Sequence, residues 1–247
     1  MPIIYSSESG SSNDGYVAKD LQSSWANARD ATSGSSRVTS STASANFAKV
    51  YKMNFRGGGV MYGVSRSFMV FDTSGITGTV ASATLSVYGY SANDGSVIAV
   101  KGTAFGGDGN TGLAKADIDA IDGWSAGSSL AGSATVYGSQ ILTTNWSISG
   151  YNDFTATSDL LADMKNNDVV IIAFMDYTYD YLNVAPGFLF PNIGGYYANY
   201  TGTSRDPKID YTLGPSGYAN TVNGVAAANI GKINGVATAS ISKVNGI

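Results

Sequence analysis

Apolar and polar residues alternate with a period of two along much of this 247-residue chain, a pattern typical of half-buried β-strands. Within residues 83–90, Leu85 and Val87 alternate with polar or aromatic residues. Residues 67–71 are almost continuously apolar, so we expect a central strand there that is buried on both faces. Residues 169–175 form the strongest β segment of the second half. Together these segments predict an all-β protein.

Turn and helix signals separate the expected strands. Three consecutive glycines at 57–59 predict a turn before a strand at 60–70. Asn-Asp-Gly at 93–95 predicts a β-hairpin whose second strand is 96–101. The apolar spacing in residues 113–124 indicates a short helical strap packed on the sheet.

The second half of the chain continues this organisation. We expect strands at 135–142 and 146–154, a short helix at 158–165 with Ser158 as its N-cap, and a closing strand at 208–213. One β-sandwich core accounts for all of these elements.

Residues 176–181 extend the last strong strand with strict alternation of tyrosine. In a strand, Tyr177, Tyr179 and Tyr181 would share one face. Aromatic rings beside carboxylates are a common way to hold a sugar ring, so this face is a candidate carbohydrate site. Packing against a neighbouring strand or subunit is the interpretation we favour, because aromatic residues are enriched in strands and in interfaces.

A second aromatic cluster follows two glycines and contains Tyr196, Tyr197 and Tyr200. It has the same two interpretations, a carbohydrate site and internal packing, and packing is again favoured. A glycan site would require these side chains to be exposed together in one shallow patch.

The composition excludes most familiar catalytic machinery. The chain has no cysteine and no histidine, so it has no thiolate nucleophile, no Ser-His-Asp relay and no imidazole-ligated zinc site. Glu8 is the only glutamate, and a glycosidase would therefore need two aspartates as its carboxylate pair. We expect no enzymatic activity and no cofactor, with a structural calcium ion left open.

Charge and hydropathy also limit the partners. The net charge of −4 argues against nucleic acid, which attracts faces rich in lysine and arginine. No apolar run approaches the ~18 residues of a membrane helix, and the first residues lack the basic and apolar regions of an export signal. We expect no nucleic acid and no membrane among the partners, and synthesis in the cytoplasm.

Several charged residues have structural interpretations. Four aspartates that could offer oxygen ligands to calcium lie close together in the sequence: Asp108, Asp117, Asp119 and Asp122. Their spacing does not match an EF-hand loop, so a solvated acidic face is favoured. Asp72 follows a buried strand and precedes Thr-Ser-Gly, which predicts an Asx-turn. Arg66 is expected to pair with an acid at the edge of the sheet.

Several phrases of the sequence resemble one known family. Residues 65–76 read SRSFMVFDTSGI and residues 83–89 read ATLSVYG, followed by GYNDF at 150–154 and YTGTSRDPK at 200–208. These phrases resemble, in order, the landmarks of the DNRLRE-type, carbohydrate-binding-module-like domains, from residue 10 to residue 213. The resemblance implies an antiparallel jelly-roll β-sandwich, found in bacterial surface proteins and phage structural proteins, usually without catalytic residues.

An eleven-residue repeat closes the chain: the phrase Val/Ile-Asn-Gly-Val/Ile occurs three times after residue 221, with Ala-x-Ala-x-Ile-x-Lys in both gaps. It resembles the "NGV-A-x-A-x-I-x-K" tails of phage virion proteins. Asn-Gly is a poor helix interior and a good two-residue turn, so we favour short strands or single turns joined there. The composition changes after the Gly-Pro-Ser-Gly at 214–217, which predicts a β-sandwich domain at 1–213, a linker at 214–217 and a repeat tail at 218–247.

So few repeats bury little surface alone, and we expect the tail to be ordered against partner chains. A trimer of this chain is favoured, and docking on another virion component is the second arrangement. A flexible linker is the alternative. The residues expected to supply the oligomerisation or attachment contacts are Val222, Val225, Ile230, Ile233, Val236, Ile241 and Val244.

The leading interpretation is therefore a non-catalytic phage virion structural protein, used as capsid decoration or as a tail or fibre surface protein. Its expected partners are other copies of itself, other virion proteins and a host surface glycan, and its expected location is the virion. A secreted or surface carbohydrate-binding module is the alternative. A polysaccharide-degrading enzyme that depends on two aspartates is less favoured.

Overall fold

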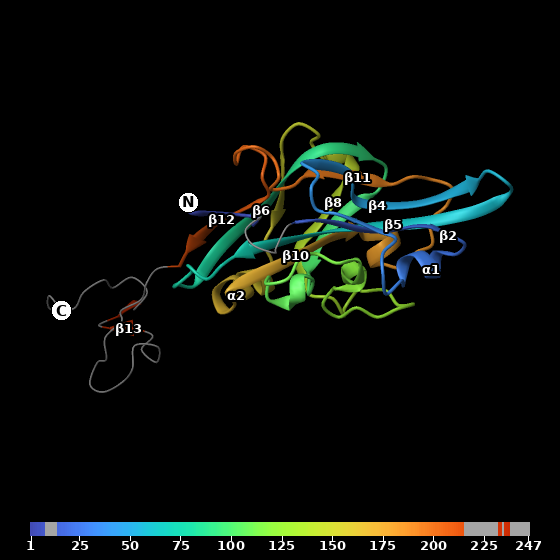
Figure 1. Ribbon diagram of the computed structural model, residues 1–247. Coiled ribbons are helices and arrows are strands. Elements are labelled where there is room, and N and C mark those ends of the chain that lie inside the picture. The colour runs from blue at the N-terminus through green and yellow to red at the C-terminus, as the bar shows by residue number, and fades with distance from the viewer. Residues whose placement is uncertain (8–13, 215–231, 234, 238–247) are drawn as a thin grey trace.

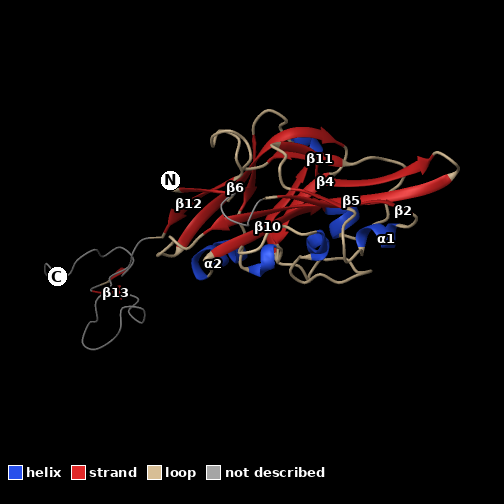
Figure 2. Cartoon of the chain, viewed as in Figure 1, coloured by secondary structure: helices blue, strands red, loops and turns tan. Residues whose placement is uncertain are grey.

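The computed structural model describes residues 1–7, 14–214, 232–233 and 235–237 (Figure 1). Strands dominate this part of the chain, and the helices are few and short (Figure 2). Twelve of the described strands form one antiparallel sheet that curls over on itself. None of the helices in the described ranges is long and apolar enough to cross a lipid bilayer.

The sheet has a continuous strand order β1-β12-β6-β11-β4-β5-β10-β7-β8, with β9 beside β6, β2 beside β5, and β3 beside β2. Its strands are β1 (Ile3–Tyr5), β2 (Gly15–Gln22), β3 (Ser36–Val38), β4 (Ala43–Phe55), β5 (Gly59–Asp72), β6 (Val80–Asn93), β7 (Ser96–Lys101), β8 (Val136–Leu142), β9 (Tyr151–Thr155), β10 (Val169–Asp176), β11 (Asn192–Tyr196) and β12 (Lys208–Leu213). The helical elements are α1 (Trp25–Arg29), α2 (Ser158–Asn166), the 3₁₀ turns η1 (Phe105–Gly107), η2 (Lys115–Asp119) and η3 (Thr143–Asn145), and the π-helical turn η4 (Tyr177–Tyr181).

Two apolar cores lie on opposite faces of β5 and β10. Met69 and Phe71 of β5 point into the first core, which fills the inside of the curled sheet and includes Leu85 of β6. Phe68 and Val70 point into the second core, which lies under α1 and the segment 104–130. Because successive side chains of a strand point to opposite faces, a continuous apolar run suits a strand between two cores. The buried central strand expected at 67–71 is confirmed.

The all-β, antiparallel fold predicted from the alternation is confirmed, while the finer jelly-roll connectivity stays a prediction.

The expected hairpin across residues 93–95 is wrong. β6 pairs with β9, β11 and β12, whereas β7 pairs with β8 and β10. Asp94 and Gly95 have positive φ values of 34° and 109°, and this turn carries the chain to a different part of the curled sheet.

The predicted helical elements are present with altered ends. The strap is the 3₁₀ turn η2, and its neighbour Leu113 is fully buried in the second core. The N-cap of α2 is Thr157 rather than Ser158, because the Thr157 hydroxyl accepts a hydrogen bond from the backbone N–H of Leu160 at 3.4 Å. The strand expected from residue 146 begins only at Tyr151.

The repeat tail is described in one short segment. β13 (Lys232–Ile233) and β14 (Val236–Ala237) pair antiparallel, with Ile233 opposite Val236 and Gly235 at a φ of 82° between them. Short strands, as expected for the repeat, are thus present in this unit. The other expected contact residues lie outside the described residues: Val222, Val225, Ile230, Ile241 and Val244.

Candidate functional site

The strand expected through residues 176–181 is wrong. β10 ends at Asp176, whose side chain accepts a hydrogen bond from the backbone N–H of Tyr179 at 2.7 Å and starts the π-helical turn η4. The rings of Tyr177 and Tyr181 stack at 5.4 Å, and Tyr181 is only 5% exposed. Tyr177 and Tyr179 pack against the second core. These three tyrosines therefore form no exposed platform, and the packing interpretation describes them better.

A buried ion pair holds η4 in place. The Arg66 guanidinium on β5 donates from Nε and Nη2 to the two carboxylate oxygens of Asp180, both at 2.7 Å, and both side chains are fully buried. Arg29 of α1 donates to the backbone oxygen of Asp180 at 2.8 Å. The guanidinium carbon of Arg66 lies 4.2 Å from the ring centre of Trp124, and that of Arg29 lies 4.6 Å from it. The acid that pairs with Arg66 is thus buried, not at a sheet edge.

Tyr196 and Tyr197, adjacent in sequence, lie in different environments. Tyr197 is 1% exposed, and its hydroxyl lies 2.7 Å from that of Ser67. Burial raises the pKa of Tyr197 well above its ordinary value. Its ring is therefore not available to a ligand, whereas Tyr196 is only partly buried.

Tyr196 belongs to a cluster on the outer side of the sheet, which we call the tyrosine–arginine surface. The members come from β6, β9, β11 and the loop before β12, and all are partly buried or exposed: Tyr88, Tyr90, Tyr151, Tyr196, Tyr200 and Arg205. Strand pairing places Tyr88 directly opposite Tyr151. The alternation in β6 puts Tyr88 and Tyr90 on the face opposite the buried Leu85 and Val87.

Arg205 lies at the centre of this surface. Its guanidinium carbon is 5.1 Å from the ring centre of Tyr88 and 4.9 Å from those of Tyr196 and Tyr200. One guanidinium nitrogen also donates a hydrogen bond to the Tyr196 hydroxyl at 2.6 Å. A cation held against aromatic rings in this way is attracted by their negative faces. The loop residue is thereby fixed against strands β6 and β11.

The rings contact one another edge to face. Tyr196 is the common partner: its ring centre lies 5.4 Å from Tyr88, 5.9 Å from Tyr90 and 5.5 Å from Tyr200. Such T-shaped pairs match the positive edge of one ring to the negative face of the next. Tyr90 is 49% exposed, which makes its ring an accessible apolar contact at the rim of the surface.

Tyr151 completes the cluster at its other side. Its hydroxyl donates to the backbone oxygen of Asp206 at 3.0 Å, and the Lys208 ammonium lies 4.9 Å from its ring centre. Burial raises the pKa of Tyr151 to about 12, with nearby Tyr5 and Asp206 adding to the rise. The hydroxyl therefore remains a protonated donor at physiological pH.

A glycine in β6 permits the chain to pass close beneath this surface. A Cβ atom on Gly89, between Tyr88 and Tyr90, would lie 1.8 Å from the backbone oxygen of Ser147. Any side chain there would push the 143–150 loop away from the strand. The close approach of this loop thus requires glycine at position 89, between the two tyrosines.

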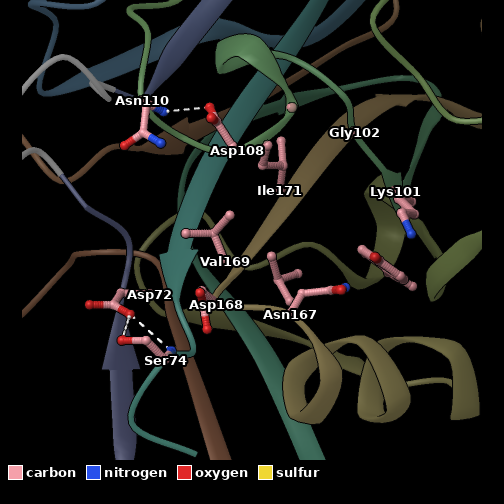
Figure 3. A pocket seen from close by; sticks show the side chains of 13 residues that line it. Asp72, Ser74, Lys101, Gly102, Asp108, Asn110, Asn167, Asp168, Val169 and Ile171 are labelled. Carbon is pink, nitrogen blue, oxygen red and sulfur yellow. Dashed lines mark hydrogen bonds between the residues drawn. The ribbon is translucent and has the colours of Figure 1, made fainter.

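A second feature is a polar hollow of about 650 Å³ at the far end of β5, which we call the acidic hollow. Figure 3 shows Asp72 and Asp168 near one end of it and Asp108 with Asn110 at the other. Asp72 forms the predicted Asx-turn, because its Oδ1 accepts from the backbone N–H of Ser74 at 3.0 Å and from the Ser74 hydroxyl at 2.6 Å. These hydrogen bonds hold the pKa of Asp72 below its usual value.

The only lysine that lines the described hollow is already paired. The Lys101 ammonium lies 2.9 Å from an oxygen of Asp163, and that same oxygen accepts a hydrogen bond from the Tyr137 hydroxyl. Hydrogen bonds from Asn110 lower the pKa of Asp108. The hollow therefore presents negative charge.

Three of the four aspartates considered as calcium ligands, Asp108, Asp117 and Asp122, accept separate hydrogen bonds. Asp108 accepts from Asn110, Asp117 accepts from the backbone of Ala114, and Asp122 accepts from the Thr135 hydroxyl. Within the ranges that the structure describes, no three acidic side chains come together as a metal-binding group. The acidic-face interpretation fits these contacts.

Comparison with protein-family models and with curated proteins finds no match to this chain. Sequence reasoning singled out Tyr196 and Tyr200 of the tyrosine–arginine surface, but it did not identify its other members: Tyr88, Tyr90, Tyr151 and Arg205. These residues are far apart in sequence, and strand pairing together with the loop before β12 brings them together.

Proposed function

We propose that the protein is a non-catalytic structural protein of a phage virion that displays this all-β domain and contacts host surface carbohydrate through the tyrosine–arginine surface. The observation that carries the binding role is Arg205 among the rings of Tyr88, Tyr196 and Tyr200, beside the exposed Tyr90. A tyrosine ring packs against the apolar C–H face of a sugar, and a guanidinium donates hydrogen bonds to its hydroxyl oxygens.

The remaining chemistry favours binding over catalysis. Glycoside hydrolysis needs one carboxyl group whose pKa is raised so that it can act as an acid. In the acidic hollow, hydrogen bonds from Ser74 and Asn110 lower the pKa of Asp72 and of Asp108. The pKa of Asp176 is raised to about 6, but that side chain is 2% exposed and does not line the hollow.

A glycan array with the full-length protein tests the binding role. Tyr90→Ala and Arg205→Gln are expected to weaken binding to the captured glycans about tenfold each, which corresponds to the loss of one aromatic or charged contact. Val184→Ala is the control, because Val184 is 46% exposed and does not belong to this surface. Binding that survives both surface substitutions would remove the carbohydrate role from this site.

The anchoring role rests on the repeat tail and has its own test. A chain that ends at residue 217 is expected to stop binding virions that lack the protein. A truncated chain that still binds them would exclude the tail as the attachment module. Neither result depends on whether a glycan is bound.

A further inference from the structure

The strands β4 and β5 continue beyond the body of the molecule as a two-stranded arm, residues 52–62 (Figure 1). Within the arm the strands pair with each other as far as Phe55 opposite Gly59. Strand β11 pairs with β4 as far as Lys49, and the preceding segment 189–191 continues beside β4 as far as Lys52. Strand β2 pairs with β5 as far as Tyr62. The outer part of the arm is thus supported on neither side by a further described strand.

The arm combines exposed aromatic rings with positive charge. Phe55 is 45% exposed, and beside the arm Phe188 and Phe190 are 61% and 42% exposed. The Lys52 ammonium lies 4.5 Å from the ring centre of Phe188. The sequence carries no acidic residue from position 31 to position 71, although the whole chain has a net charge of −4. Exposed apolar rings of this kind, gathered on one projection, mark an interaction surface.

The charge of the arm decides between two ways in which copies of the chain could use it. Unpaired strand edges can pair with one another, which would place two arms side by side. That arrangement brings Lys52 and Arg56 of one copy next to the same cations of the other, and like charges across an interface are unfavourable. An acidic partner surface suits the arm better.

Such a surface lies at the opposite end of the same strand. β5 begins in the arm at Gly59 and ends at Asp72, which lines the acidic hollow together with Asp108 and Asp168. The strand is about 40 Å long at the usual rise per residue. The tip of the arm is slender, because Gly57 and Gly58 have no side chains and a Cβ atom on either would meet nothing within 4 Å. One molecule thus carries a narrow cationic projection and, at the other end of β5, an acidic depression.

We propose that the arm of one copy of this chain docks in the acidic hollow of a second copy, so that the copies associate head to tail. The contact joins two different surfaces, so each copy keeps a free arm or a free hollow until a ring closes or a filament grows. Arg56 is placed to meet Asp72, Asp108 and Asp168, and Val169 and Ile171 offer apolar surface in the hollow. This inference requires neither a glycan nor the repeat tail.

Disulfide trapping between two full-length variants tests the contact directly, since the natural chain contains no cysteine. One variant carries Asn54→Cys in the arm and the other Asn167→Cys in the hollow, both at exposed positions. Mild oxidation of the mixture is expected to give the 54–167 heterodimer as the main product. Ser204→Cys, in an exposed loop outside both surfaces, replaces Asn167→Cys in the matched control.

Salt and charge reversal then test the chemistry of the contact. Raising the salt from 0.1 M to 1 M shortens the screening length from about 10 Å to about 3 Å, and the yield is expected to fall about fivefold or more. Arg56→Glu in the arm variant, or Asp168→Lys in the hollow variant, is expected to reduce the yield similarly. The two reversals together are expected to restore it.

Three results would overturn the proposal. The first is a 54–167 yield no higher than that with the loop cysteine. The second is a dominant 54–54 product, which would assign the arm to symmetric pairing. The third is a yield unaffected by either reversal. Circular dichroism of each variant confirms that the fold is retained, because exposed substitutions usually change stability little.

Discussion

Replacing Asp176 by asparagine is expected to stabilise the protein at neutral pH. The carboxyl lies at the end of β10 and is 2% exposed. It accepts hydrogen bonds from the backbone N–H of Tyr179 at 2.7 Å and of Ser96 at 3.4 Å. Burial raises the pKa of Asp176 to about 6, with the carboxylate of Asp180 adding to the rise and the backbone hydrogen bonds opposing it.

The sign and size of the effect follow from this pKa. The ordinary value is 3.8, so between pH 4 and pH 6 the folded protein holds this proton and the unfolded chain has released it. The free energy of unfolding therefore falls as the pH rises through that window, by about 3 kcal/mol at about 1.4 kcal/mol per pKa unit. The asparagine variant does not show this fall in the free energy of unfolding, because asparagine has no proton to release. Its NH₂ group cannot accept from Ser96, which offsets about 1 kcal/mol and leaves a net gain of about 2 kcal/mol at pH 7.

Urea unfolding of both proteins at half-unit steps from pH 4 to pH 8 measures the difference. The control is Asp72→Asn, because hydrogen bonds from Ser74 lower the pKa of Asp72. That carboxylate stabilises the fold above its unfolded pKa of 3.8, so Asp72→Asn is expected to be less stable than wild type by a nearly constant amount from pH 4 to pH 8. A difference between wild type and Asp176→Asn that stays constant from pH 4 to pH 8 would refute the assignment of the raised pKa to this burial.

The remaining predictions concern stability and are measured by urea or thermal unfolding. Arg66→Met leaves the buried Asp180 carboxylate with only Arg29, whose Nε lies 3.6 Å from Oδ1, and is expected to cost about 3 kcal/mol; adding Asp180→Leu should recover much of this, and no recovery would argue against a charge effect. Thr157→Ala is expected to cost about 1 kcal/mol through loss of the α2 N-cap, and an equal loss for Ser158→Ala would show that the cap is misassigned. Gly89→Ala is expected to cost about 1–3 kcal/mol by overpacking, and an unchanged unfolding temperature would contradict the close approach of the 143–150 loop.

The strands of the core could be predicted from the sequence because burial acts on each of them separately. Alternation located β6, and the continuous apolar run located the middle of β5, where Phe68 and Met69 enter different cores. Which strands pair with each other was harder to predict from the sequence. Asp94 and Gly95 have the residue types of a hairpin turn, and nothing local tells whether the two flanking strands pair with each other.

The candidate sites could be predicted less well. Residues 176–181 alternate like a strand, yet Asp180 pairs with Arg66, which is 114 residues away, and this buried contact overrides the local pattern. Adjacent tyrosines gave no sign that Tyr197 would be buried and Tyr196 partly exposed. No pattern in the local sequence marks Arg205 as a binding residue. Its contacts with Tyr88 and Tyr196 arise only when its loop folds over β6 and β11.

The position of β5 has a mechanical consequence. Backbone hydrogen bonds join this strand to β4, β2 and β10 along successive parts of its length. A pull on the arm acts along the strand axis and therefore at right angles to these bonds, which must break together rather than one at a time. Tension applied at the arm is consequently resisted in shear by the ladders that join β5 to β2 and β10 and β4 to β11, and the geometry suits a surface that bears load.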